Sequence, residues 1–365
     1  MRKNIAKRTV YGWALWRYIE RERMAIGTNQ MERWHLRDMH QGSKVSYLTR
    51  WLTSHVATRT RDADVTVRST WIDHYPQAHS YYQATAGAPI NPVSVELADL
   101  LLVVKVQDSG GLALSERAVL LQAKCADHPE FLDASHAGSS THDERNLLEA
   151  CCAPIRVTSA SGRASPPINS ARVDYDLGAS AVQLGLESYA RYLLVPRDES
   201  PQKLPYMTVW PSALIARSGS LAHFSDVMLA MTGMGTPGAF AGADVNTAAA
   251  TTGWDHLVKD LTDYCNGQPP LNRFRTKTGL AFPRHIERSY DVSTFHPFRA
   301  IVSSFLRRVF EGSWLERSWQ LQMMPDGAGK MPPPGREDDL QDSPIGGFTH
   351  LQVTITAPKP LKPLG

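Results

Sequence analysis

The sequence contains few cysteines, no long apolar run and little net charge, and these absences narrow the class of protein. Its four cysteines are Cys125, Cys151, Cys152 and Cys265. They form neither a C-x-x-C pair nor a zinc-finger spacing with histidine. Neither a disulfide framework nor a structural zinc site is therefore predicted, and we expect reduced thiols in a cytoplasmic protein.

No apolar segment approaches the roughly 18 residues that a membrane-spanning helix needs. The first residues are basic and then mixed, without the apolar region and cleavage site of a signal peptide. Hydrophobic residues make up 42% of the chain and charged residues 21%, which is typical of globular proteins. We expect a soluble protein of 365 residues, long enough for one large domain or two ordinary ones, with no membrane partner.

Two common functional motifs are also missing. The chain has no G-x-S-x-G elbow for serine catalysis. Residues 233–238 satisfy G-x-G-x-x-G, but the preceding segment has a helical pattern and Pro237 lies inside the motif. A dinucleotide site needs a strand before the glycines and a helix after them, so we predict a loop over 233–253.

The net charge of +3 is unevenly distributed. Residues 1–71 hold 14 Lys/Arg against 6 Asp/Glu, together with five of the nine tryptophans. Basic residues interleaved with aromatic ones suit a nucleic-acid surface, because guanidinium groups contact phosphate and rings stack on bases. Candidate contacts are Lys44, Arg50, Arg59 and Arg61. The alternative, arginines extending past buried tryptophans on ordinary helices, stays open.

Hydrophobic periodicity predicts both helices and strands. The predicted helices are 10–25, 43–60, 143–151, 254–265 and 296–311. The predicted strands are 64–73, 99–106, 117–124, 189–195, 206–210 and 348–356. Pro76 and the segment 87–92 are interpreted as chain breaks, and 156–172 as a loop. Asp143 or Thr141 is expected to cap its helix, and Asp143 and Glu144 are expected to be cap and surface residues. The alternative, that Asp143 and Glu144 approach Lys124 from this helix, stays open.

Two apolar segments predict an antiparallel hairpin. Residues 99–106 are almost continuously apolar, as in a strand that is buried on both faces. Turn-forming residues at 108–111 separate them from the second segment, 117–124. Gln122 and Lys124 are two residues apart and so share one face, where the hairpin would bring them beside Asp99. In the alternative, Gln122 and Lys124 are solvated at a sheet edge and Asp99 caps a turn.

This pattern resembles the PD-(D/E)XK nuclease superfamily, which has the restriction-endonuclease-like fold. The resemblance covers about residues 64–125 and rests on Asp99, the turn, and an apolar strand that ends in Gln122 and Lys124. Glu96 matches an additional upstream acid that members often carry. Gln122 stands where the commoner form has Glu; the Gln-x-Lys form is known, especially among bacterial defence and restriction nucleases.

The resemblance implies a Mg²⁺- or Mn²⁺-dependent endonuclease that hydrolyses phosphodiester bonds, with DNA as the expected partner and restriction or anti-phage defence as its role. Asp99, Gln122, Glu96 and the carbonyl of Ala123 would bind the metal. Lys124 would orient the attacking water or stabilise the developing charge. Gln122 leaves one fewer negative charge for the ion than Glu would.

We therefore predict an α/β protein with a mixed central sheet flanked by helices and a restriction-endonuclease-like core, its basic N-terminal helices packed near the active face. Residues 1–155 would form this core, 326–347 a linker and 348–357 a terminal strand. Residues 172–325 have no assigned role and are either part of the same domain or a partner-binding or oligomerisation module. The rival functions are a non-catalytic nucleic-acid-binding or assembly protein of the same fold, and a different hydrolase with its site in the C-terminal half.

Overall fold

The computed structural model describes thirteen parts of the chain. They are residues 36, 42–60, 63–72, 76–126, 139–159, 166–196, 207–209, 222–267, 274–275, 281–282, 285–293, 348–358 and 361. The predicted helices at 10–25 and 296–311, the predicted linker at 326–347, and Arg61 lie outside these residues.

A mixed sheet of nine strands forms the centre of the protein, and eight of them follow the order β10-β9-β8-β5-β4-β15-β1-β14, while β11 pairs with β5. Their bounds are β1 Asp64–Ile72, β4 Leu100–Gln107, β5 Ala113–Ala126, β8 Ala190–Pro196, β9 Met207–Val209, β10 Ala222–His223, β11 Ala243–Asp244, β14 His285–Ser293 and β15 Phe348–Thr356. β4 and β5 pair antiparallel, whereas β15 is parallel to β4 and β8 is parallel to β5. The predicted α/β class with a mixed central sheet is confirmed, as is the antiparallel hairpin.

A smaller sheet has the order β3-β2-β6-β7, and a separate pair is formed by β12 and β13. The bounds are β2 Gln77–Gln83, β3 Ile90–Glu96, β6 Ile155–Thr158, β7 Asp174–Tyr175, β12 Phe274–Arg275 and β13 Ala281–Phe282. The sequence interpretation of this region was wrong in two places. The predicted chain break at 87–92 holds the turn at Gly87 but also the start of β3, and β6 overlaps the first residues of the predicted loop at 156–172 because Ile155 and Val157 are buried where this strand pairs with β2.

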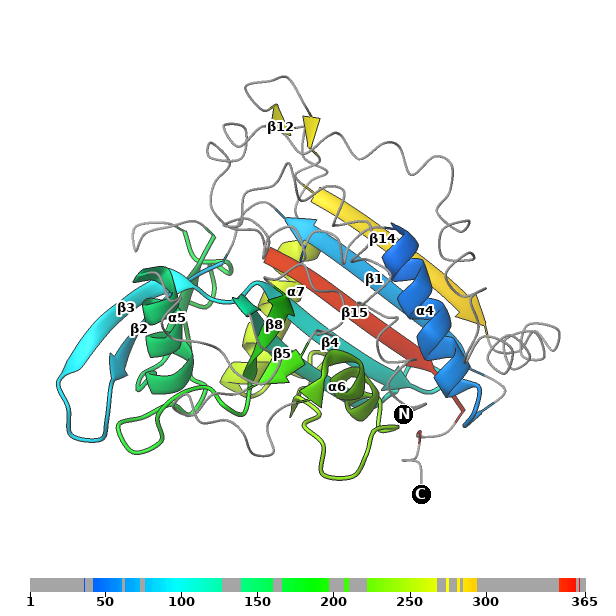
Figure 1. The fold of residues 1–365 in the computed structure, drawn as a ribbon, viewed down its shortest axis with the longest axis horizontal. Coiled ribbons are helices and arrows are strands. Elements are labelled where there is room, and N and C mark those ends of the chain that lie inside the picture. Colours follow the sequence, from blue (N-terminus) through cyan, green and yellow to red (C-terminus); the bar gives the residue numbers. More distant parts are fainter. Residues whose placement is uncertain are drawn as a thin grey trace.

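The described part of the chain holds four helices. They are α4 Gly42–Val56, α5 Ser139–Ala150, α6 Phe224–Met231 and α7 Gly253–Gly267. α5 packs against β2 and β3 of the smaller sheet, and the others flank the central sheet. In Figure 1, α4 and α6 lie in front of the sheet and α7 lies behind it. α4 and α6 share one hydrophobic cluster with Val119 and Leu121, whereas α5 and α7 share the other with Leu120.

The expectation that the N-terminal basic helices pack near the active face is wrong for α4. This helix lies over β1 and β14, on the face that holds Leu121. Gln122 and Lys124 alternate with Leu121 and therefore point to the opposite face. The reason is the apolar stripe of α4, which includes Val45, Leu48 and Leu52 and finds its apolar partners on that side of β1 and β15.

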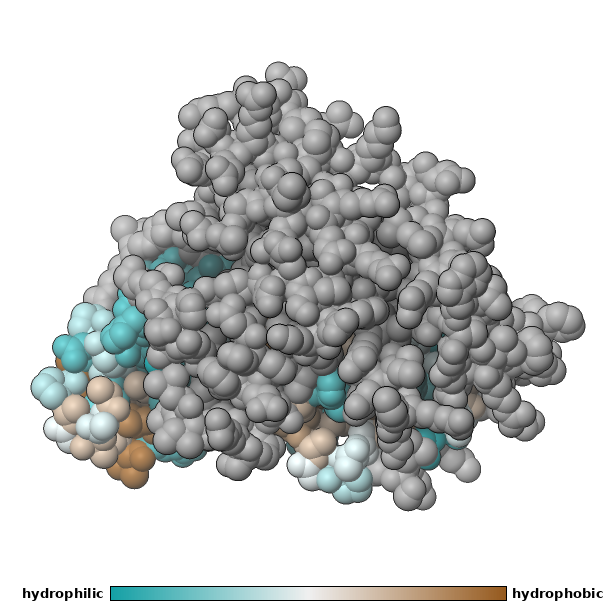
Figure 2. All heavy atoms as spheres, in the orientation of Figure 1, coloured by the Kyte–Doolittle hydropathy of each residue, from teal (hydrophilic) through white to brown (hydrophobic). Residues whose placement is uncertain are grey.

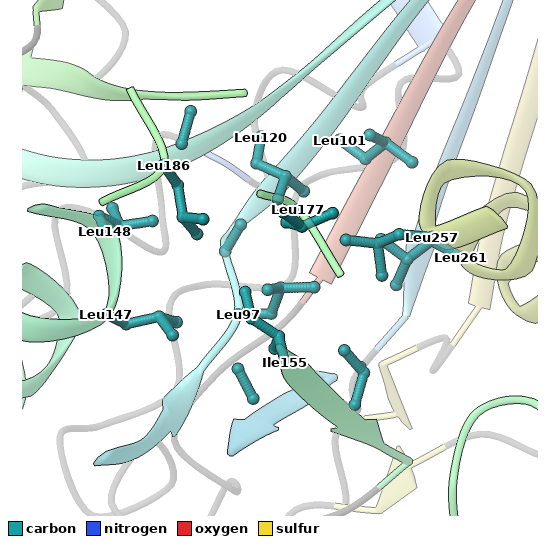
Figure 3. Packing of buried hydrophobic residues seen from close by; sticks show 14 of the residues in the cluster. Leu97, Leu101, Leu120, Leu147, Leu148, Ile155, Leu177, Leu186, Leu257 and Leu261 are labelled. Carbon is teal, nitrogen blue, oxygen red and sulfur yellow. The ribbon is translucent and has the colours of Figure 1, made fainter. Parts of the chain in front are cut away.

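The cluster beneath α5 and α7 ties the two sheets together. Figure 3 shows Leu101 and Leu120 of the central hairpin among Leu177, Leu257 and Leu261. In the same view, Leu97 lies by Ile155 of the smaller sheet, and Leu148 of α5 lies by Leu186.

Figure 2 shows mixed hydrophilic and hydrophobic side chains at the end of the molecule that holds β2 and β3. Among the described residues, no helix combines the length and apolarity needed to cross a bilayer.

Two reciprocal capping hydrogen bonds hold the first turn of α7. The hydroxyl of Thr252 accepts a hydrogen bond from the Asp255 N–H at 3.1 Å, and the Asp255 carboxylate accepts one from the Thr252 N–H at 2.9 Å. Burial raises the pKa of Asp255, but backbone N–H groups of Asn246, Thr252 and Thr251 outweigh it and lower that pKa to about 2. The predicted helix at 254–265 is thus confirmed and anchored at its first turn.

The interior of the central sheet also holds a buried histidine. His350 of β15 is fully buried opposite Thr70 of β1, and neither ring nitrogen has a hydrogen-bond partner among the described residues. Burial, assisted by the positive charge of Arg68, lowers the pKa of His350 to about 4. The folded protein therefore holds this imidazole neutral at neutral pH.

His350 should make the protein less stable in mild acid. Between about pH 6.5 and 4 the unfolded chain binds a proton at this position and the folded chain does not, so stability is complete above this window and falls by up to about 3 kcal/mol across it. His350→Leu should flatten that slope in urea denaturation measured from pH 7 to pH 4. The exposed position His142 gives the control His142→Leu, and an unchanged slope in His350→Leu would contradict the assignment.

Candidate functional site

Asp99 is held at the start of β4 by the end of the neighbouring strand. Its N–H donates to the carbonyl of Leu121 at 3.0 Å, and its Oδ2 accepts from the N–H of Ala123 at 2.7 Å. The pairing of Leu100 with Leu121 sets this register. Asp99 is only 5% exposed, so a backbone N–H is one of the few donors that can satisfy its carboxylate.

Gln122 lies directly against this carboxylate. Its Nε2 donates to Asp99 Oδ2 at 2.5 Å, and the residue is 2% exposed. Its other amide atom, Oε1, is buried and accepts no hydrogen bond from the described residues. A buried acceptor without a donor costs about 1–3 kcal/mol, so this oxygen is ready to accept a cation or a donor.

Lys124 follows on the same face and is 8% exposed. Its Nζ forms an ion pair with Glu144 Oε2 of α5 at 2.6 Å, with both side chains almost completely buried. The alternative of a solvated edge hairpin is therefore wrong. β5 has β4 on one side and β8 on the other, and α5 packs onto the cluster beneath its polar face.

Glu144 is the residue that the sequence interpretation misplaced. It was expected on the surface, but it is 6% exposed and faces Lys124, whereas Asp143 is exposed as expected. α5 begins at Ser139, so Thr141 and Asp143 lie inside the helix and do not cap it. The sequence does contain a spacing that indicates burial of Glu144. This residue lies three and four residues before the buried Leu147 and Leu148, which places all three on one face of a helix.

A second polar group of α5 lies next to the pair. Glu149 accepts a hydrogen bond from the Tyr192 hydroxyl at 3.0 Å and from Arg145 Nε at 3.1 Å. Tyr192 stands opposite Gln122 in the pairing of β5 with β8. Burial, followed by the charge and hydrogen bond of Glu149, raises the pKa of Tyr192 above its usual value. The Tyr192 phenol therefore stays protonated.

The other predicted site residues lie on other elements. Glu96 ends β3 in the smaller sheet and is half-buried. Arg50 is exposed on α4, Arg59 is half-buried just after that helix, and Lys44 lies within it. The structure thus brings Asp99, Gln122, the backbone of Ala123 and Lys124 together, and it places α4 on the opposite face of the sheet.

The oxygen atoms of the centre fit a hard cation. Asp99 supplies a carboxylate and Gln122 an unpaired amide oxygen, and Mg²⁺ typically takes one or two carboxylates and keeps several waters. In the described part of the chain, no group of three or more His, Cys, Asp or Glu side chains is arranged to hold a metal. A metal here would therefore depend on the Gln122 amide as well as on acids.

Comparison with known proteins gives no family assignment: the chain matches no family model, no curated protein and no solved structure.

Removing one partner of the Lys124–Glu144 ion pair should strongly destabilise the fold, whereas replacing both partners with apolar residues should destabilise it much less. Glu144→Ala should lower the free energy of unfolding by about 3–5 kcal/mol, because it leaves the Lys124 ammonium buried without its counter-ion. Lys124→Met combined with Glu144→Leu should recover most of that loss, because apolar side chains of similar volume suit a dry site. Urea denaturation of both variants measures this difference.

An exposed ion pair provides the control. Lys259 and Asp263 on α7 also lie 2.6 Å apart, but both are largely exposed and screened by solvent, so Asp263→Ala should destabilise the protein far less than Glu144→Ala. Equal losses in Glu144→Ala and Asp263→Ala would show that Lys124 reaches solvent when Glu144 is absent.

Proposed function

We propose that this protein is a metal-dependent nuclease that hydrolyses phosphodiester bonds, with DNA as the expected substrate and Asp99, Gln122 and Lys124 as its central residues. The observation that carries the proposal is the meeting of these three buried polar side chains at the end of the hairpin where Leu100, Leu120 and Leu121 are buried. Asp99 and Gln122 are in direct contact, and Lys124 lies on the same face. Apolar packing alone does not explain an amide, a carboxylate and an ammonium at this point.

The surrounding topology supports a restriction-endonuclease-like core. β4 and β5 form the hairpin, α5 follows β5, and β8 then pairs parallel to β5. This arrangement places α5 over the face that holds Gln122 and Lys124, with Glu144 directed at Lys124. The role in bacterial restriction or anti-phage defence comes from the resemblance of the motif and is part of the proposal.

Each residue has a defined task in this proposal. Asp99, fixed by the Ala123 N–H, and the free oxygen of Gln122 would hold Mg²⁺ or Mn²⁺. The bound ion supplies an activated water and offsets negative charge at phosphorus. Lys124 would donate to the oxygens on which negative charge develops, where a preorganised cation in a dry site is most effective.

One feature of the site favours a second candidate, a non-catalytic nucleic-acid-binding or assembly protein. The charge of Lys124 is already neutralised by Glu144, and Gln122 contributes no negative charge of its own. A protein that only binds nucleic acid would not need a metal for affinity. The two functions therefore differ in their response to a chelator.

Cleavage of plasmid DNA should require both the metal and the hairpin residues. Asp99→Asn and Lys124→Ala should each reduce the rate in Mg²⁺ or Mn²⁺ by roughly 10²-fold or more, because each removes a group that holds the ion or stabilises charge. EDTA should abolish cleavage by the unmodified protein. The rate of loss of supercoiled plasmid is the measurement.

Lys105 provides the matched control, because it lies on β4 of the same hairpin, opposite Glu116 and far from Asp99 along the strand. Lys105→Ala should cleave as the unmodified protein does. Melting temperatures show whether each variant folds, and Lys124→Arg, which keeps the charge beside Glu144, tests the same role if Lys124→Ala does not fold. Cleavage that persists in both Asp99→Asn and Lys124→Ala would place the active site elsewhere. DNA binding that survives EDTA and Lys124→Ala, without cleavage, would establish the binding protein instead.

A further inference from the structure

The central hairpin has one carboxylate where a divalent ion commonly has two. Asp99 is charged, but Gln122 is neutral. Mg²⁺ and Mn²⁺ prefer oxygen ligands, and protein sites usually provide one or two carboxylates together with waters. A second acid near Gln122 would restore the charge that the amide does not provide.

Glu144 is placed to be that acid. Its carboxylate lies 2.6 Å from Lys124 Nζ, and Lys124 is two residues from Gln122 on the same face of β5. Glu144 also adds to the raised pKa of Tyr192, after the larger effects of burial and Glu149, and Tyr192 is the direct neighbour of Gln122 on β8. Glu144 therefore lies over the segment of β5 that holds the amide.

We propose that Glu144 is the second carboxylate of the metal site, so that Asp99, the Gln122 oxygen and Glu144 bind one divalent cation. A second observation, which concerns the Gln122 amide and not the acidic side chains, supports this proposal. Gln122 is 2% exposed, and its Oε1 accepts no hydrogen bond from the described residues, so this buried oxygen has the capacity to bind a cation. The proposal rests on the metal dependence of the proposed function, but it concerns binding rather than cleavage.

The ion pair with Lys124 fits this role. A buried carboxylate must be paired when no metal is present, and Lys124 supplies the charge. A divalent cation carries twice the charge of an ammonium and so competes for the same carboxylate. On metal binding, Glu144 would then divide its interaction between the ion and Lys124, and the Lys124 ammonium would become available to substrate.

The test is the affinity for Mn²⁺, measured by isothermal titration calorimetry on the full chain without nucleic acid. Glu144→Gln should weaken binding by at least about tenfold, because it removes a charged ligand. The double variant Gln122→Glu, Glu144→Gln should bind Mn²⁺ with an affinity within about threefold of the unmodified protein. It places the second carboxylate at position 122 instead of 144 and so restores the negative charge of the site. Recovery in the double variant separates a ligand from a merely structural acid.

The matched control is Glu149→Gln on the same helix, whose carboxylate is held by Arg145 and Tyr192. It should leave the Mn²⁺ affinity unchanged. If Glu144→Gln does not fold, as judged by its melting temperature in EDTA, Glu144→Asp gives a second test. That variant keeps the charge but withdraws the carboxylate by one methylene, and it should also bind Mn²⁺ more weakly.

Unchanged affinity in Glu144→Gln would overturn the inference and leave Glu144 as a structural counter-ion. Tighter binding would overturn it too, because Glu144 would then oppose the metal. If the protein cleaves DNA in a metal-dependent way but Glu144→Gln binds Mn²⁺ normally, the inference fails and the proposed function stands. If Mn²⁺ binds through Glu144 without any cleavage, the inference stands and the nuclease function fails. No Mn²⁺ binding by the unmodified protein would overturn both.

Discussion

Burial of the β4–β5 hairpin on both faces is the constraint on which the rest of the structure depends. Leu101 and Leu120 pack beneath α5 and α7, and Leu102 and Leu121 pack with the cluster of α4 and α6. Water does not reach such strands freely, so any polar side chain on them must find a partner within the protein. Asp99 finds its partner in the backbone N–H of Ala123 in the same hairpin, whereas Lys124 pairs with Glu144 of α5.

The sequence predicts the elements whose apolar periodicity is clear over a short segment, and the strand pair that a short turn connects. The apolar alternation of β1, the hairpin of β4 and β5, and the periodicity of α4 and α7 all lie close to their predicted bounds. The contact between Asp99 and Gln122 follows from the hairpin alone, because antiparallel pairing over a short turn fixes the register.

Contacts between distant segments could not be predicted in this way. β15 was expected as a strand, but nothing in its sequence shows that it inserts between β4 and β1, which both lie more than about 240 residues before it along the chain. The partner of Lys124 was missed for a related reason. Acids are common in the first turn of a helix, which favoured a surface position for Glu144. Only the folded contact of Glu144 with Lys124 of β5 shows that it lies on the buried face of α5 with Leu147 and Leu148.

Asp260 of α7 and Glu144 of α5 are both buried acids, but the protein satisfies them in different ways. Asp260 of α7 accepts hydrogen bonds from Tyr175 at 2.8 Å and from Asn169 at 2.9 Å, with Arg172 also near. Such a network joins α7 to β7 and to the loop before it, so its contribution to the stability of the fold explains why Asp260 is buried there.

Glu144 and Lys124 form a different kind of buried pair. Ion pairs of this kind commonly stabilise a fold no better than apolar side chains of the same volume, because two charges must be desolvated. The pair also stands beside an amide oxygen that has no partner among the described residues. Packing alone gives no reason for an unpaired acceptor and a charged pair to lie next to one carboxylate, whereas a cation that joins these oxygens would account for both.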